Sequence, residues 1–318
     1  MKRRLLDILV CPDSRTRLEL EVFKSDGDEI MEGALRSSPG KIYPIKGGIP
    51  RFVSSEAYTA SFGYEWNRHS RIYFDGKDKH RMYSTHSQLG RKLDLNPDKV
   101  RDAVVLDVGC GTGANAAAIA DWGARDVLCV DLSSAVDAAF ANTRHLDNVH
   151  VVQADLFCLP FAHERFDLLY SMGVLHHSID KRKAFLSLVP YLKDSGVIAI
   201  WVYHNVGGLQ QRLSDKLRTL TTKMSPKVLY RFCYLAVPAY YLYKVPVLGK
   251  FLFYFLPPIS KEPYWEDRLL DTFDWYSPSY QWKHTYPEVY SWFKEAKLVD
   301  IHLLDVPVSI WGRKVASA

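Results

Sequence analysis

The stretch of sequence that decides the fold is Asp107-Val108-Gly109-Cys110-Gly111-Thr112-Gly113. It continues a run of apolar residues that begins at 104, and an alanine-rich segment, 114–120, follows it at once. Glycines at alternate positions permit a tight turn, and they let a ligand approach the backbone because no Cβ stands in the way. The stretch therefore predicts a buried strand over 104–108, a ligand-binding turn and a helix.

Elements of the same kinds alternate along the rest of the chain. Apolar runs predict further strands at 127–130, 149–152, 166–170, 197–202, 298–304 and 306–311. Helical patterning occurs at 133–144, 181–192 and 287–296. Strands that alternate with helices are typical of a parallel sheet with crossover helices. We therefore predict an α/β fold, a Rossmann-like, mostly parallel sheet with flanking helices.

The first 53 residues do not follow this alternation. Apolar and charged side chains alternate over 18–22, and turn-forming residues follow at 25–28 and 37–40. A period of two indicates strands that expose one face to water. Residues 1–53 are therefore expected to form a small β-rich N-terminal module.

The remaining chain divides into two more parts. Residues 54–103 are polar and aromatic, and we interpret them as a linker and cofactor-covering segment around Phe62-Gly63-Tyr64-Glu65-Trp66. Residues 104–318 form the main domain, which 205–285 interrupts after the fifth expected strand of the parallel sheet. An insertion at the carboxyl end of a parallel strand lies beside the ligand crevice. We therefore expect 205–285 to be a helical lid.

Composition and charge exclude several classes of protein. The chain has 318 residues, 41 Lys+Arg against 36 Asp+Glu, and a formal charge of +5, which argues against a nucleic-acid partner. The apolar run after the basic start is too short for a signal peptide. The longest charge-free piece of the apolar stretch 229–259 is about half of what a membrane-spanning helix needs. We expect a cytoplasmic protein with reduced thiols and no transmembrane segment.

Two acids follow strands at the positions where a nucleoside would need them. Asp131 ends the second expected strand, where a carboxylate can accept hydrogen bonds from both ribose hydroxyls. Asp155 follows the third, where an adenine amino group would lie. The dinucleotide pattern Gly-x-Gly-x-x-Gly would need a glycine where Ala114 stands, and it leaves Asp107 unexplained. An aminoacyl sulfonium ligand instead brings an ammonium group that Asp107 can help to hold.

These motifs carry a family resemblance. With Phe166-Asp167 and Gly173-Val174-Leu175-His176-His177 after the fourth strand, they make residues 104–203 and 286–311 resemble a class I S-adenosylmethionine-dependent methyltransferase with a methyltransferase type 11-like core. The resemblance implies S-adenosylmethionine as the cofactor. It also implies a catalytic site at the carboxyl ends of the strands.

The resemblance further implies which residues bind the cofactor. The methionyl part would be held at the glycine-rich turn by Asp107, Gly109, Cys110, Gly111 and Gly113. The ribose would be held after the second strand by Asp131 and Leu132, and the adenine after the third strand by Asp155 and Leu156. The sulfonium would be lined, at the fourth strand, by Ser171 and Met172. Glu65 and Trp66 either fold over the cofactor, since an aromatic face attracts a sulfonium, or only attach the linker to the core.

A second resemblance concerns the N-terminal module. Residues 5–12 and 43–50 look like the Trm112-like family of small zinc-associated modules. That family often carries Cys-Pro-x-Cys, but Ser14 stands at the second cysteine position, and a structural zinc site needs four ligands. We therefore expect a module that lacks the zinc cysteines, with Cys11 as a small buried side chain, and no metal site in the chain.

Several side chains are candidates for the general base. His176 and His177 follow the fourth strand, next to the expected sulfonium, and histidine titrates near neutral pH. His177 can equally cap a helix or bond a backbone carbonyl. Tyr203 and His204 end the fifth strand and are further catalytic candidates. His284 either reaches over the crevice or lies in a surface loop.

Aromatic residues of the insertion are candidates for the acceptor pocket. Acidic neighbours of Trp275 and Tyr276 suggest an exposed loop, from which both rings would form pocket walls. The stretch 229–259 suits a helical cap, a wall around a hydrophobic acceptor, a peripheral membrane contact or a subunit contact in a homodimer.

The features above predict an enzyme, an S-adenosylmethionine-dependent methyltransferase. It would transfer a methyl group by in-line displacement to an oxygen or nitrogen of a small metabolite, with oxygen slightly favoured because histidine bases suit hydroxyl acceptors. Two alternatives stay open. One is an RNA methyltransferase, suggested by the Trm112-like start, and the other is a non-catalytic, cofactor-binding interaction protein.

Overall fold

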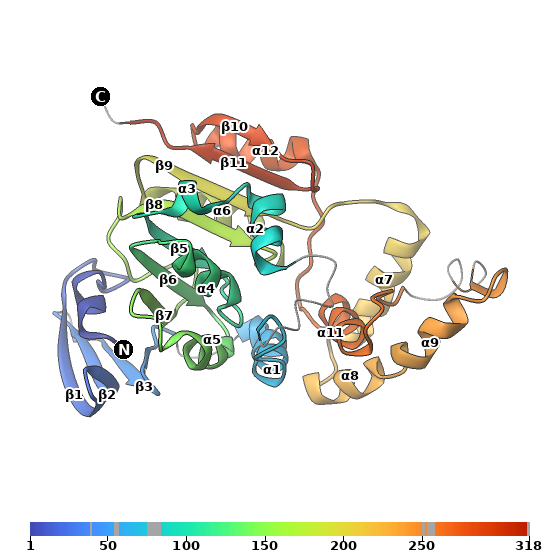
Figure 1. Cartoon of the computed structure of the whole chain (residues 1–318), viewed down its shortest axis with the longest axis horizontal. Helices are drawn as coiled ribbons and strands as arrows, with labels where there is room; N and C mark the ends of the chain where they lie inside the picture. Colours follow the sequence, from blue (N-terminus) through green and yellow to red (C-terminus); the bar gives the residue numbers. More distant parts are fainter. Residues whose placement is uncertain (39, 54–56, 75–83, 250–251, 253–257, 317–318) are drawn as a thin grey trace.

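The computed structural model describes residues 1–38, 40–53, 57–74, 84–249, 252 and 258–316. A small β module and a group of helices lie at opposite ends of a central α/β part (Figure 1). The domain limits predicted at 53, 103 and 205–285 stay a proposal.

The central part is a seven-stranded sheet in the order β10-β11-β9-β8-β5-β6-β7. Five strands run parallel, and β11 pairs antiparallel with both β9 and β10. The strands are β5 Val104–Val108, β6 Asp126–Asp131, β7 Val149–Gln153, β8 Phe166–Met172, β9 Leu192–Trp201, β10 Val299–Leu303 and β11 Ser309–Arg313. This mostly parallel sheet confirms the predicted fold class. The strand order reverses at β5, and ligands bind at such switch points.

Helices cover both faces of the sheet and bury it completely at its centre. All five residues of β5 and of β7 are buried. On one face, α4 (Ala114–Asp121) and α5 (Ala135–Thr143) contribute small side chains to a shared hydrophobic cluster. On the other, α6 (Lys181–Leu188) and α12 (Tyr286–Glu295) contribute large aromatic ones. The three-layer arrangement explains why the strands read as continuous apolar runs.

Two predicted element limits were wrong around Pro190. The helix predicted over 181–192 ends at Leu188, and a short 3-10 turn, Val189–Tyr191, follows it. Proline has no backbone N–H, so Pro190 cannot donate the hydrogen bond that would continue the helix. Because the helix ends early, the next strand can begin early: β9 starts at Leu192, whereas the strand was predicted over 197–202.

The N-terminal module is an antiparallel sheet of four strands that packs against the central part. Its strands are β1 Leu18–Asp26, β2 Glu29–Ser37, β3 Ile42–Lys46 and β4 Ile49–Pro50. Cys11 is fully buried there, as predicted, with its Sγ 3.4 Å from the hydroxyl of Tyr43. Within the described ranges, no group of three or more His, Cys, Asp or Glu residues is placed to hold a metal ion.

The module also binds a segment of the central part that follows β7. The guanidinium of Arg15 donates to the carbonyls of Leu159 and Phe161, each at 3.0 Å. The backbone N–H of Phe52 donates to the carbonyl of Gln153 at 2.8 Å. Residues 153–161 are therefore held from the module side, and Asp155 lies within that segment.

The segment 54–103 is more structured than the predicted linker. It contains the helices α1 (Ala60–Arg68), α2 (Thr85–Leu93) and α3 (Pro97–Val100). Ser84 and Asn96 begin the last two helices as N-caps, each accepting a bond from a backbone N–H three residues on. Leu89 and Leu93 bury their side chains in the sheet's hydrophobic cluster. The pattern was missed because polar residues surround these few apolar anchors.

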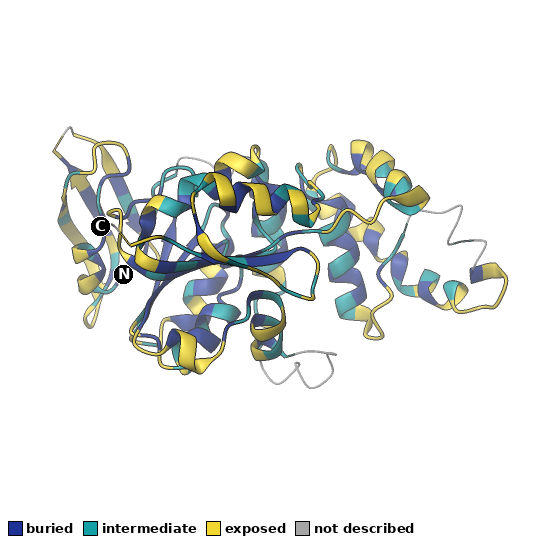
Figure 2. Cartoon of the chain, turned by 90° about the horizontal axis from the view of Figure 1, so that it is seen from above, coloured by how far each residue is buried: buried dark blue, intermediate teal, exposed yellow. Residues whose placement is uncertain are grey.

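The insertion after β9 is helical, as predicted. It contains α7 (Gly208–Thr221), α8 (Pro226–Cys233), α9 (Ala236–Tyr243) and α11 (Trp265–Tyr276). Figure 2 shows these helices with buried inner faces and exposed outer faces. Across the described residues, none of the helices has the length and apolar character needed to cross a bilayer.

One prediction about the insertion was wrong. Trp275 and Tyr276 do not form an exposed loop but end α11, and neither lines the cavity described below. Tyr276 is buried in a small cluster with Leu229 and Phe273, and its hydroxyl donates to the carbonyl of Pro258 at 2.6 Å. The acidic neighbours that suggested a loop instead lie on other faces of the helix.

Candidate active site

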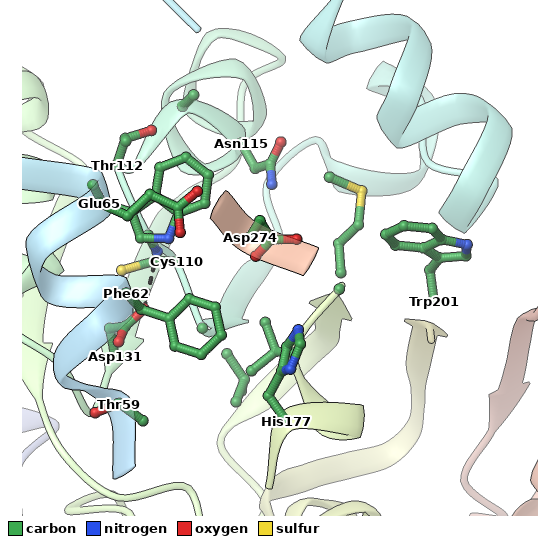
Figure 3. Close-up of a pocket in the computed structure, with 18 of the residues that line it drawn as sticks. Thr59, Phe62, Glu65, Cys110, Thr112, Asn115, Asp131, His177, Trp201 and Asp274 are labelled. Atoms are coloured by element: carbon green, nitrogen blue, oxygen red, sulfur yellow. Dashed lines mark hydrogen bonds between the residues drawn. The ribbon is translucent and has the colours of Figure 1, made fainter. Parts of the chain in front are cut away.

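A cavity of about 500 Å³ opens at the carboxyl ends of the central strands. Its floor is formed by residues that follow β5, β6, β7 and β8, and α1 and α11 cover it from the side of the insertion (Figure 3). The volume lies within the range of small-molecule sites. The cavity therefore occupies the place at which the switch of strand order predicts a ligand.

The glycine-rich turn forms one wall because its backbone conformation excludes side chains. Gly109, Gly111 and Gly113 have φ of 83°, 52° and 79°, the left-handed region that favours glycine. A Cβ at residue 109 would overlap the methyl groups of Val174. The turn thus needs glycine both for its conformation and for its contact with the segment after β8.

Adding a methyl group at residue 109 should loosen this turn. In Gly109→Ala the new Cβ would lie 2.8 Å from Cβ of Val174, and the positive φ would strain the backbone. We expect a loss of about 1–3 kcal/mol of stability, measured by thermal unfolding. Val174→Ala in the same chain should restore part of it. Gly208→Ala is the control, since residue 208 has a φ of 86° but no atom lies near the position of a Cβ. An equal loss of stability in this control would mean that backbone strain alone, and not the contact with Val174, causes the effect.

Asp131 joins the end of β6 to the turn. One carboxylate oxygen accepts the N–H of Gly111 at 3.1 Å, and the other accepts the N–H and the hydroxyl of Ser133 at 2.9 and 2.8 Å (Figure 3). These bonds fix the orientation of the carboxylate at the cavity wall. The neighbouring Leu132 also lines the cavity.

Asp155 and Leu156 line the cavity on the β7 side. One oxygen of Asp155 accepts the N–H of Phe157 at 3.0 Å, which closes a local turn. The predicted ribose and adenine residues are thus brought to one wall, on neighbouring strands.

Three of the predicted cofactor residues lie behind the wall rather than in it: Asp107, Gly113 and Ser171. The hydroxyl of Ser171 donates to the carbonyl of Val108 at 3.0 Å and so ties β8 to β5. Burial raises the pKa of Asp107 to about 7. Gly109, Cys110, Gly111 and Met172 do line the cavity.

Trp66 lies over the glycine-rich turn. A Cβ at Gly111 would lie 3.5 Å from Nε1 of Trp66, and the Trp66 ring centroid is 5.9 Å from that of Tyr73. Phe62, on the same helix α1, and Thr59, the residue before that helix, also line the cavity (Figure 3). Phe62 and Trp66 thus lie at the cavity, whereas Tyr64 packs against Tyr230 and Phe273 of the insertion.

Among the described residues, His177 is the histidine that lines the cavity (Figure 3). Its Nδ1 is 2.8 Å from the carbonyl of Tyr280, so that nitrogen carries the proton and donates it. Nε2 is left as an acceptor, and within the described part of the chain it has no hydrogen-bond partner. Burial lowers the pKa of His177, which keeps the ring neutral at pH 7. These properties are those of a general base.

The other catalytic candidates have different positions. His176 is fully buried outside the cavity lining, stacked on the ring of Tyr203 at 3.8 Å. Tyr203 lines the cavity, and its hydroxyl donates to Asp274 at 2.7 Å. His204 is exposed and lies outside the lining. The surface-loop reading of His284 was wrong, since the residue is fully buried.

Several lining residues were missing from the sequence-based site. They are Tyr58, Thr59, Lys92, Trp201, Glu262, Asp267, Asp271 and Asp274. The acids Asp267, Asp271 and Asp274 recur on one face of α11, a spacing that was visible in the sequence. Tyr58, Lys92 and Glu262 show no comparable signal.

Known families match both parts of the chain. Residues 106–200 match the family described as methyltransferase domain, and residues 2–48 match the family described as Trm112p-like protein. The predicted S-adenosylmethionine-dependent methyltransferase core and Trm112-like module are thereby confirmed. The glycine cradle, the oriented Asp131 and the cavity volume fit a nucleoside cofactor of this kind.

Curated relatives include methyltransferases with different acceptors. Phosphoethanolamine N-methyltransferase 1 of Zea mays is 30% identical over 49% of this chain and 30% of its own length. Malonyl-[acyl-carrier protein] O-methyltransferase of Pseudescherichia vulneris is 35% identical over 37% and 47%. Trans-aconitate 2-methyltransferase of Deinococcus radiodurans is 36% identical over 42% and 51%. The chain thus spans about half or less of the length of these relatives.

Two solved structures are similar to parts of the chain. An S-adenosylmethionine-dependent methyltransferase from Mesorhizobium loti is 29% identical, with a TM-score of 0.32 over 33% of this chain and 49% of that one. A complex between the Haloferax volcanii Trm112 methyltransferase activator and a methyltransferase is 13% identical, with a TM-score of 0.47 over 81% and 99%.

Proposed function

We propose that this chain is an S-adenosylmethionine-dependent methyltransferase that acts on an oxygen or nitrogen of a small acceptor. The observation that carries the proposal is the cavity itself. The glycine-rich turn and Asp131 line it, and so does His177, whose Nε2 has no hydrogen-bond partner among the described residues. A nucleoside-binding wall and a free base at one cavity are what methyl transfer to a protonated acceptor requires.

In this proposal the chain positions the cofactor and the acceptor, and it deprotonates the acceptor. When bound, S-adenosylmethionine supplies an electrophilic methyl group on a positively charged sulfur. Asp131 and Asp155 hold the nucleoside, and Trp66 covers the glycine-rich turn. His177 accepts the acceptor's proton at Nε2, while the Tyr280 carbonyl keeps its Nδ1 proton in place. Alignment of the two reactants supplies several kcal/mol of the rate enhancement.

Incubation with S-adenosylmethionine labelled in its methyl group tests the activity. A fractionated metabolite extract and total RNA should be offered in parallel, with label counted in each product. Label in small molecules supports the proposal, and label in RNA alone would move the assignment to the RNA alternative. Binding of S-adenosylmethionine without any transfer would favour a non-catalytic protein, and no binding at all would contradict the cofactor.

Location and assembly belong to the same proposal. The five cysteines form no disulfide within the described chain, which supports a reducing, cytoplasmic compartment. Exposed apolar side chains on α8 and α9, among them Phe232, Tyr241 and Leu242, support either a homodimer contact or a peripheral membrane contact.

A further inference from the structure

Glu65 is the cavity residue that binding of a nucleoside does not explain. It lies on α1, its exposed fraction is 0%, and neither carboxylate oxygen has a hydrogen-bond partner in the part of the chain that the structure describes. Its carboxylate points into the cavity (Figure 3). A buried polar group without a partner costs free energy unless a ligand supplies one. Glu65 therefore points to a ligand group that donates hydrogen bonds.

Further carboxylates lie nearby on α11. Asp271 and Asp274 both line the cavity, and Asp274 is drawn opposite Glu65 in Figure 3. Asp274 accepts the hydroxyl of Tyr203 at 2.7 Å, and Asp271 accepts that of Ser260 at 3.1 Å. Burial, and then the charges of Asp274 and Asp271, raise the pKa of Glu65 well above its usual value. Burial raises the pKa of Asp271 to about 7.

Positive charge on the protein side is scarce around these acids. Among the described residues that line the cavity, Lys92 is the only lysine or arginine. Its Nζ lies 3.5 Å from the centroid of the Trp201 ring, and burial lowers its pKa to about 8. These acids do not form a metal site either, since no group of the described His, Cys, Asp and Glu residues is placed to hold an ion. The cavity is thus short of cations.

We propose that Glu65, Asp271 and Asp274, the anionic recess, bind the positively charged amine of the methyl acceptor. An ammonium group carries three donors and no acceptor, which matches three carboxylates. The inference rests on the proposed function and narrows its acceptor to amines. S-adenosylmethionine carries an ammonium of its own, so the experiment must separate the two sources.

The recess and His177 divide the work on such an acceptor. The carboxylates bind the amine in its protonated form. His177 lines the same cavity, and its Nε2 has no partner among the described residues. In the proposed step Nε2 accepts one proton from the amine nitrogen, and the electron pair left on nitrogen becomes available for attack. Neutral His177 is suited to this step because its ring is uncharged at pH 7.

Methylammonium tests the recess without knowledge of the acceptor. In the full chain saturated with S-adenosylhomocysteine, methylammonium chloride should raise Tm by about 2 °C or more over sodium chloride at equal ionic strength. Glu65→Gln should lose this shift. Glu32→Gln, which removes the same charge from an exposed site on β2, should keep it.

The same variants have a readout that needs no ligand. Because the pKa of Glu65 is raised in the folded state, the folded protein becomes less stable as pH rises above about 4.5. Without ligand, Glu65→Gln should therefore melt above the wild type at pH 8, and the difference should vanish near pH 4. A Tm difference that does not depend on pH would contradict a buried, uncompensated carboxylate.

Three outcomes would overturn the proposal. One is no methylammonium shift in the wild type, and another is an equal shift in Glu65→Gln. The third is a tenfold or larger loss of S-adenosylhomocysteine affinity in Glu65→Gln, which would assign the recess to the cofactor's ammonium. A wild type that binds no S-adenosylhomocysteine would refute the proposed function. In that case the methylammonium comparison, repeated without S-adenosylhomocysteine, would still test whether the recess binds an amine.

Discussion

Replacing His177 by asparagine should lower kcat about a hundredfold or more while changing the affinity for S-adenosylmethionine less than threefold. General bases contribute about 10²–10⁴ in rate, and an asparagine amide can still donate to the Tyr280 carbonyl, so the local structure should persist. Single-turnover rates and calorimetric titration of the same preparations give the two quantities. His145→Asn, at an exposed position on the same chain, is the matched control.

The pH dependence gives an independent readout for His177. Burial lowers its pKa below 6.5, so the base is already deprotonated at neutral pH. In the wild type, kcat at saturating acceptor should therefore stay level around pH 7 and fall only as pH drops below 6.5. The value of kcat/KM also depends on the acids of the recess, among them Asp271 with a pKa of about 7, so it does not test His177. The asparagine variant should lack the fall in kcat. An acid limb in the wild-type kcat centred above pH 7 would contradict the assignment of His177 as the base.

Replacing Asp131 by alanine should weaken binding of S-adenosylmethionine at least tenfold, about 1.4 kcal/mol or more. The variant removes the carboxylate expected to hold the ribose. It also removes the acceptor of the hydrogen bonds that the N–H groups of Gly111 and Ser133 donate. Isothermal titration calorimetry measures the affinity directly.

Two controls separate the parts of this effect. Asp131→Asn keeps an oxygen that can accept the Gly111 N–H, so it should preserve the turn and lose only part of the affinity. Asp121→Ala removes an exposed acid at the end of α4 and should leave binding unchanged. Equal affinities for Asp131→Ala and the wild type would remove the main support for a nucleoside at this wall.

The sheet and the cofactor wall could be predicted because their signals are local. The strand of 104–108, the glycine-rich turn and the next helix are contiguous, and each acid directly follows its own strand. Repeated strand–turn–helix units therefore give both the fold and the wall in chain order. Pro190 is a local signal too, since a proline there indicates that the helix ends before 192.

The acceptor side depends on contacts that no local pattern records. Glu65 and Asp274 line one cavity although more than two hundred residues separate them. The sequence likewise could not show that His177, rather than His176 or His204, faces the cavity, since both histidines of the pair follow β8. Side-chain direction there is set by the Tyr280 carbonyl from the insertion.

Fusion of the N-terminal module to the core has a consequence for how the nucleoside wall is supported. Arg15 and Phe52 bind the segment 153–161 through hydrogen bonds within one polypeptide. The effective concentration of the module at this segment is therefore set by the covalent connection between them and not by the protein concentration. An assembly of two separate chains would lose such a clamp on dilution. Here the clamp survives at any dilution, and the geometry around Asp155 is fixed each time the chain folds.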